Sequence, residues 1–155
     1  MATENIKFKL ELFSTYWDKA PTCEILINNI SKWKGEVLGT DDKPTKINFE
    51  HTLNENETYK LILDRQGKDI SQTIMENGEI KKDQMLHIKS IEIDDINIGA
   101  LVYEGVYKPT YPEPWASEQK DLPETLKNVT QMGHNGTWTM SFTSPFYMWL
   151  LENLY

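Results

Sequence analysis

Hydrophobic and polar residues alternate over much of the first 99 residues. In the stretch "IKFKLELF" (6–13), every second residue is apolar and the residues between are charged. A period of two is typical of a strand with one buried face. The same strand signal recurs at 23–29, 46–53, 58–64 and 84–94. Short strands separated by turn signals every 8 to 12 residues or so predict an all-β fold, an antiparallel, jelly-roll-like β-sandwich.

The last of these runs changes its phase. Leu86 and Ile88 have one parity, whereas Ile91 and Ile93 have the other. One extra residue near Ser90 would produce this slip, so the pattern predicts a β-bulge or a bend in this strand.

Two turn signals are prominent. Asn77-Gly78, within the long polar connection 65–83, is a strong tight-turn dipeptide. Asp94 and Asp95 interrupt an isoleucine-rich run. They could be a ligand site or a bend, and we interpret them as a hinge between strands.

Residues 100–155 have a different character. They contain more than half of the aromatic residues, and the arm 107–124 carries four prolines. An arm so rich in proline cannot be a central strand. A strand is predicted where Trp138, Met140 and Phe142 alternate with polar residues. A short apolar segment with the three-four spacing of a helix follows from Phe146. We therefore divide the chain into a sandwich domain, 1–99, and a C-terminal extension, 100–155.

Composition excludes several functions. The chain has 155 residues and a net charge of -8, and Arg65 is its sole arginine. Nucleic-acid binding needs clustered basic residues, so we expect no nucleic-acid partner. One cysteine rules out a disulfide framework. The N-terminal residues lack the pattern of a secretory signal, and no apolar stretch has the length of a membrane span, so no membrane partner is expected.

We expect no catalytic residues. Cys23, His51 and His87 lie in predicted strands, and His134 lies in the Gly-rich turn "MGHNG". None belongs to a short metalloenzyme signature, so we interpret all four as structural.

Three carboxylates are candidate metal ligands. Asp64 ends one predicted strand, Asp83 opens another, and Asp69 lies between them. If these strands are neighbours, one calcium ion could bridge the three side chains, since calcium binds carboxylate and carbonyl oxygens on loops. The alternative is that all three are solvated turn residues.

Aromatic residues are candidates for a sugar-stacking surface. An aromatic ring presents a negative face to the C–H groups of a sugar. The candidates are Trp17, Trp33, Tyr111 and Trp115. The alternatives are a protein interface and ordinary core packing.

The order of features from Ile6 to Ile98 resembles the calcium-dependent carbohydrate-binding modules attached to xylan-degrading enzymes. The similar segments are "LFSTYWDKAPTCEILINN", "YKLILDRQGKD" and "KDQMLHIKSIEID". The resemblance implies a carbohydrate-binding-module-like sandwich, and a calcium site at Asp64 or Asp69 together with Asp83. The sequence departs from the family pattern at two places near that site: Leu63 replaces the Asn expected before the strand-end Asp, and Gln84-Met85 replace an Arg-Asn pair.

The whole chain, above all "KNVTQMGHNGTWTMSFTSPFYMWLLENLY", is also similar to small proteins of tailed bacteriophages. That resemblance implies a non-enzymatic virion protein assembled in the bacterial cytoplasm, as a capsid decoration or tail-fibre component. Its partners would be other virion proteins in multiple copies. The expected partner-binding residues are Trp138, Phe142, Phe146, Tyr147, Trp149, Leu150 and Tyr155.

Two hypotheses follow. The first is a virion structural protein whose apolar tail binds a neighbouring subunit, although the tail could instead fold back on its own sandwich. The alternative is a carbohydrate-binding module that recognises surface glycans with or without calcium.

Overall fold

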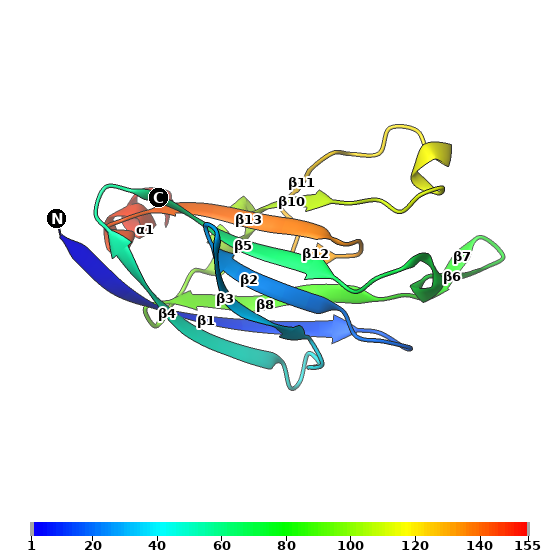
Figure 1. Cartoon of the computed structure of the whole chain (residues 1–155), viewed down its shortest axis with the longest axis horizontal. Helices are drawn as coiled ribbons and strands as arrows, with labels where there is room; N and C mark the ends of the chain where they lie inside the picture. Colours follow the sequence, from blue (N-terminus) through cyan, green and yellow to red (C-terminus); the bar gives the residue numbers. More distant parts are fainter. Residues whose placement is uncertain (1, 155) are drawn as a thin grey trace.

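Two antiparallel sheets form the body of the protein in the computed structural model, which describes residues 2–154 (Figure 1). The first sheet has the order β12 (Gln131–Met132), β8 (Met85–Ile93), β1 (Thr3–Thr15), β4 (Thr45–Asn54), with β9 (Ile96–Asn97) paired to β8. The second has the order β11 (Leu126–Lys127), β10 (Val106–Pro109), β13 (Gly136–Thr143), β5 (Thr58–Gln66), β2 (Thr22–Ile27), β3 (Ile30–Glu36). The predicted all-β sandwich is confirmed.

Smaller elements connect the strands. A separate hairpin consists of β6 (Ile74–Glu76) and β7 (Glu79–Lys82). The 3-10 helices are η1 (Ile70–Gln72), η2 (Gly99–Glu104) and η3 (Ala116–Glu118). The α-helix α1 (Phe146–Leu154) follows the last strand. No helix within residues 2–154 has the length and apolar character needed to span a membrane.

Period-two alternation places one face of each sheet in a common core. In β1, Ile6, Phe8, Leu10 and Leu12 are buried, whereas Lys7, Lys9 and Glu11 on the other face are not. The rings of Phe8 in the first sheet and Phe142 in the second lie 6.0 Å apart, so the two buried faces meet.

The phase slip predicted near Ser90 is a β-bulge. Ser90 pairs with Glu11, but the next residue of β1, Leu12, pairs with Ile88. Lys89 is therefore the extra residue, and it allows Ile88 and Ile91 both to point into the core.

Asp94 and Asp95 form the turn between β8 and β9. Ile93 pairs with Ile96, and the two aspartates have φ values of 53° and 65°. Asp tolerates this left-handed conformation better than most residues. The Tyr147 hydroxyl donates to Asp94 Oδ2 at 2.5 Å, which ties the turn to α1.

The expected boundary at residue 99 does not separate two sheets. From the C-terminal part, β13 pairs with β5 along its whole length, and β12 pairs with β8. Strands from the C-terminal part thus complete both sheets of the sandwich, because they hydrogen-bond to strands from the first part.

The aromatic tail folds back on its own sandwich. Its strand and helix bury Trp138, Phe142, Phe146, Trp149 and Leu150, each of which is less than one-tenth exposed. We expected these five side chains to bind a partner; in this fold they pack in the core of the protein itself. Tyr147 is 46% exposed, and Tyr155 lies outside the described residues.

Candidate functional site

A cavity of about 550 Å³ opens at the end of the sandwich opposite α1. In Figure 1 the β6–β7 hairpin and the segment at residues 110–125 (yellow) both project from this end. Three stretches line the cavity: 68–83, 110–115 and 133–135. The lining side chains that the following argument uses are Lys68, Asp69, Thr73, Asp83, Tyr111, Trp115 and His134.

A smaller hollow of about 340 Å³ lies over Phe8 and Phe49. These two rings stack on each other with their centroids 5.0 Å apart. The charged residues around them include an ion pair in which Lys9 Nζ lies 3.7 Å from Glu92 Oε2. Since Phe8 is buried and offers a ligand almost no ring surface, the larger cavity is the better candidate site.

Three aromatic rings gather on one part of the larger cavity. The centroids of Trp115 and His134 lie 5.8 Å apart with planes at 28°, and those of Tyr111 and Trp115 lie 6.1 Å apart. The Tyr111 hydroxyl donates to the Pro123 carbonyl at 2.6 Å. All three rings are half-buried, so each keeps an accessible surface within a fixed arrangement.

His134 is neutral at physiological pH. Burial lowers its pKa, and the positive charge of Lys68 lowers it further. Its backbone is held by Tyr107, whose hydroxyl donates to the His134 carbonyl and accepts from the His134 N–H at 2.9 Å. A neutral imidazole in a fixed position behaves as an aromatic surface with one donor and one acceptor.

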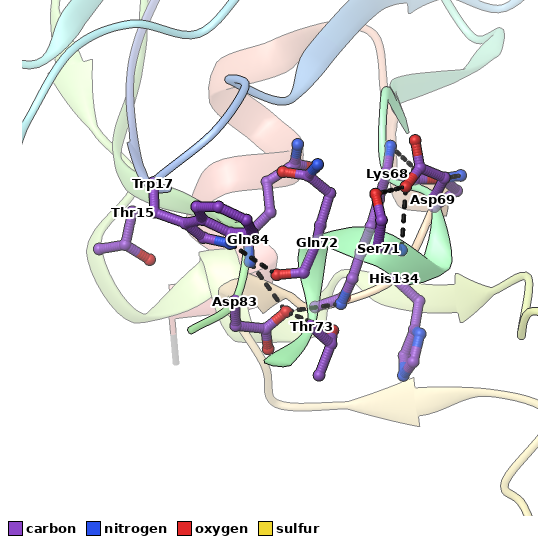
Figure 2. Close-up of polar contacts among 12 residues, drawn as sticks. Thr15, Trp17, Lys68, Asp69, Ser71, Gln72, Thr73, Asp83, Gln84 and His134 are labelled. Atoms are coloured by element: carbon purple, nitrogen blue, oxygen red, sulfur yellow. Dashed lines mark hydrogen bonds and ion pairs between the residues drawn. The ribbon is translucent and has the colours of Figure 1, made fainter. Parts of the chain in front are cut away.

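The polar part of the cavity centres on Asp83. Its Oδ1 lies 2.8 Å from Lys68 Nζ and accepts hydrogen bonds from Thr73 Oγ1 and the Gln84 N–H, both at 2.8 Å (Figure 2). Burial by itself would raise the pKa of Asp83, but these hydrogen bonds outweigh it and the pKa is lowered. The carboxylate is therefore ionised at neutral pH.

Asp69 is the second carboxylate of the cavity. Its Oδ2 lies 2.7 Å from Lys19 Nζ, and its Oδ1 accepts from the Ser71 N–H at 3.0 Å. Hydrogen bonds from Lys19 and then from Ser71 lower the pKa of Asp69 to about 2. A glycosidase needs one carboxyl with a raised pKa as its general acid, and neither Asp69 nor Asp83 has one.

A buried cation holds the lining segments together. Arg65 is fully buried, and its Nη1 and Nη2 donate to Asn135 Oδ1 and the Gln84 carbonyl, both at 2.9 Å. Asn135 in turn donates to the Lys68 carbonyl at 2.8 Å. Burial lowers the pKa of Arg65 to about 10, so it remains charged at neutral pH. This network links the stretches that carry Lys68, Asp83 and His134.

The expected calcium ligands are not brought together. Asp69 and Asp83 line the cavity, but Asp64 does not, and its Oδ1 accepts from Gln66 Nε2. Within residues 2–154 there is no group of three or more His, Cys, Asp or Glu side chains that could hold a metal ion. Each cavity carboxylate is already bonded to an ammonium group, so the residues present do not fit a calcium ion.

Only two of the four expected stacking residues share the cavity. Tyr111 and Trp115 line it together. Trp17 does not; its Nε1 donates to the Gln72 carbonyl at 2.9 Å, and Lys82 Nζ lies 4.7 Å from its ring. Trp33 packs on the core from the edge strand β3.

Two cavity residues were not expected. His134 was interpreted as structural, and Lys68 was not singled out. A histidine in a Gly-rich turn and a lysine in a polar connection carry no local signal of a site. Only the fold shows that the chain brings them together.

Comparisons with known proteins give a likeness in the arrangement of strands. No protein-family model matches the chain, and the search of curated proteins found no match. The selenomethionine form of vCBM60, from work on two families of calcium-dependent carbohydrate binding modules, has a TM-score of 0.49 and 7% identity, covering 86% of this chain and 88% of that chain. The structure of vCBM60 in complex with galactobiose has a TM-score of 0.46 and 11% identity, and the match covers 86% of this chain and 95% of that chain. Likeness at this level does not bear on the cavity residues, and none of these comparisons points to a virion protein.

Proposed function

We propose that this protein is a non-catalytic carbohydrate-binding protein that holds a sugar in the 550 Å³ cavity. The observation that carries the proposal is the combination, in one cavity, of three aromatic rings with an ionised donor–acceptor group. The rings belong to Tyr111, Trp115 and His134, and the polar group to Lys68 and Asp83.

Both kinds of surface suit a sugar. A pyranose ring has faces of C–H groups and an equator of hydroxyl groups. The C–H groups pack on the negative faces of aromatic rings, and the hydroxyl groups need hydrogen-bond partners of both kinds. A concave site with a mainly apolar lining and a few fixed polar groups is typical of small-ligand binding.

Affinity electrophoresis in polysaccharide gels tests the proposal. The panel includes xylan, after the sequence resemblance, and galactan, after the galactobiose bound by vCBM60. We expect at least one polysaccharide to retard the wild type. Trp115→Ala should weaken binding about tenfold, or about 1.4 kcal/mol, because it removes one stacking surface.

The chain offers a matched control. Tyr103 on η2 is a tyrosine with an exposed ring that does not line the cavity. Tyr103→Ala should leave the retardation unchanged, whereas Tyr111→Ala should reduce it. Equal retardation of Trp115→Ala, Tyr111→Ala and the wild type would show that the sugar does not bind here.

A second candidate function is assembly with a neighbouring protein. The outer face of α1 exposes four apolar side chains: Tyr147, Met148, Leu151 and Leu154. A partner that covered this face would remove apolar surface from water. The tail resemblance would make that partner a virion protein and the location a virion. Mass spectrometry of purified virus particles tests this, and absence of the chain from them would exclude the role without affecting carbohydrate binding.

A further inference from the structure

An ammonium group occupies the polar centre of the cavity. Lys68 Nζ lies 2.8 Å from Asp83 Oδ1 (Figure 2). It also donates to the Gly133 carbonyl at 2.5 Å. The Lys68 side chain is only 9% exposed, so this positive charge is almost buried. A carboxylate and a backbone carbonyl are also the kinds of oxygen that calcium binds. The Lys68 ammonium group thus lies among the oxygen atoms where the sequence predicted a calcium ion.

The ion pair keeps hydrogen-bonding capacity for a ligand. An ammonium group has three N–H donors. Two of those of Lys68 are used by Asp83 and the Gly133 carbonyl, which leaves one. Among the described residues, every hydrogen bond to the Asp83 side chain uses Oδ1, which leaves Oδ2 as an acceptor on a carboxylate that is 23% exposed. A donor and an acceptor therefore lie next to each other in the cavity.

This pair matches two neighbouring hydroxyl groups of a sugar. One hydroxyl oxygen can accept from the Lys68 ammonium while the adjacent hydroxyl donates to Asp83 Oδ2. Hydrogen bonds in which one partner is charged are shorter and stronger than neutral ones. The surrounding bonds from Thr73 and Gln84 hold the carboxylate in one position, so little ordering is needed when a ligand binds.

A calcium ion bound at Asp83 Oδ1 would have to displace the lysine. Moving Nζ away from Asp83 and Gly133 would leave a nearly buried ammonium without partners, which is strongly unfavourable. The other carboxylate in the cavity, Asp69, is engaged by Lys19 at 2.7 Å. Without breaking an ion pair, the two carboxylates offer a metal one oxygen that has no partner among the described residues, Asp83 Oδ2. Calcium binds six to eight oxygens, so this single oxygen beside an ammonium group does not make a calcium site.

We propose that the cavity binds two adjacent hydroxyl groups of a sugar directly through the Lys68 ammonium and the Asp83 carboxylate, without a calcium ion. This rests on the proposed carbohydrate-binding function and specifies how the same site recognises its ligand. Trp115 supplies the stacking surface, while the ion pair supplies the polar recognition.

Two measurements test this inference. The first is affinity electrophoresis in xylan and galactan gels, in EDTA and in calcium chloride, of the wild type, Lys68→Met, Asp83→Asn and Trp115→Ala. We expect EDTA to leave the wild-type retardation unchanged, and Lys68→Met and Asp83→Asn each to weaken binding about tenfold or more. Lys81→Met is the matched control, since Lys81 carries the same charge outside the cavity and should have no effect. Near-UV circular dichroism checks that each variant is folded. If Lys68→Met does not fold, the results for Asp83→Asn and for EDTA decide the test.

The second measurement is calorimetric titration of the wild type with calcium chloride, where we expect no binding up to about 1 mM, the weak end of protein calcium sites. Calcium-dependent retardation, or calcium binding that Asp83→Asn abolishes, would overturn the inference. The inference would also be wrong if Lys68→Met and Asp83→Asn were retarded like the wild type while Trp115→Ala lost its retardation. In that case the proposed carbohydrate-binding function would still hold. Failure of every polysaccharide to retard the wild type would overturn both.

Discussion

Replacing Trp149 by alanine measures how strongly α1 is held on the sandwich. Trp149 is 8% exposed. The centroid of its ring lies 6.2 Å from that of Phe142 and 5.8 Å from that of Phe146. A buried tryptophan removes about 150–250 Å² from water. At about 25 cal/mol per Å² this corresponds to about 4–6 kcal/mol. That is an upper value, because an unfolded chain already buries part of its surface.

We therefore expect Trp149→Ala to lower the free energy of unfolding by about 3–5 kcal/mol, the usual range for such a truncation. Because domains of this kind have a total stability of about 5–15 kcal/mol, the loss is a large share of it. At about 2–4 °C per kcal/mol, Tm should fall by about 6–20 °C. Urea unfolding followed by fluorescence or circular dichroism gives the free energy, and calorimetry gives Tm.

Leu151 provides the control on the same helix. It is 61% exposed, so Leu151→Ala should change the free energy of unfolding by no more than about 0.5 kcal/mol. Equal urea midpoints for Trp149→Ala and Leu151→Ala would refute the reasoning, because they would mean that the inner face of α1 does not pack on the sandwich. Truncation after residue 143 is a poorer test, since it removes buried and exposed residues together.

Two further predictions concern titratable groups. The lowered pKa of Asp83 means that its ionised form stabilises the fold above its unfolded pKa of about 4, and that this stabilisation is lost as pH falls through the folded pKa. The urea midpoint of Asp83→Asn should therefore fall less than that of the wild type between about pH 5 and about pH 3, and parallel profiles would contradict the ion pair. Cys23 is 1% exposed and burial raises the pKa of its thiol, so DTNB should label it only after unfolding. Rapid labelling of the native protein would show that the start of strand β2 opens to solvent.

Much of the fold follows from local pattern. The alternation of Trp138, Met140 and Phe142 predicts β13 correctly because a half-buried strand requires a period of two. Asn77-Gly78 predicts the turn of the β6–β7 hairpin because both residues adopt positive φ, 54° and 80°. The edge strand β3 was missed because none of its residues is fully buried, so it has no apolar alternation to detect.

The candidate site was only partly predictable. Tyr111 and Trp115 were named as stacking residues on composition alone, but so were Trp17 and Trp33, which lie elsewhere. Lys68 and His134 are 66 positions apart in the chain, and no local pattern relates them. They lie close together because β5 pairs antiparallel with β13, which places the C-terminal end of β5 beside the N-terminal end of β13. Long-range pairing of this kind is not encoded in any short segment.

The segments that line the cavity and the helix α1 lie at opposite ends of the molecule (Figure 1). The two ends can therefore be occupied at the same time. A molecule grafted to a support, a bead or a larger assembly through its α1 end would point the cavity outward, with the mouth open to solvent. The long axis of the sandwich then acts as a spacer, and surface display of this protein through that end would leave the proposed sugar-binding cavity accessible.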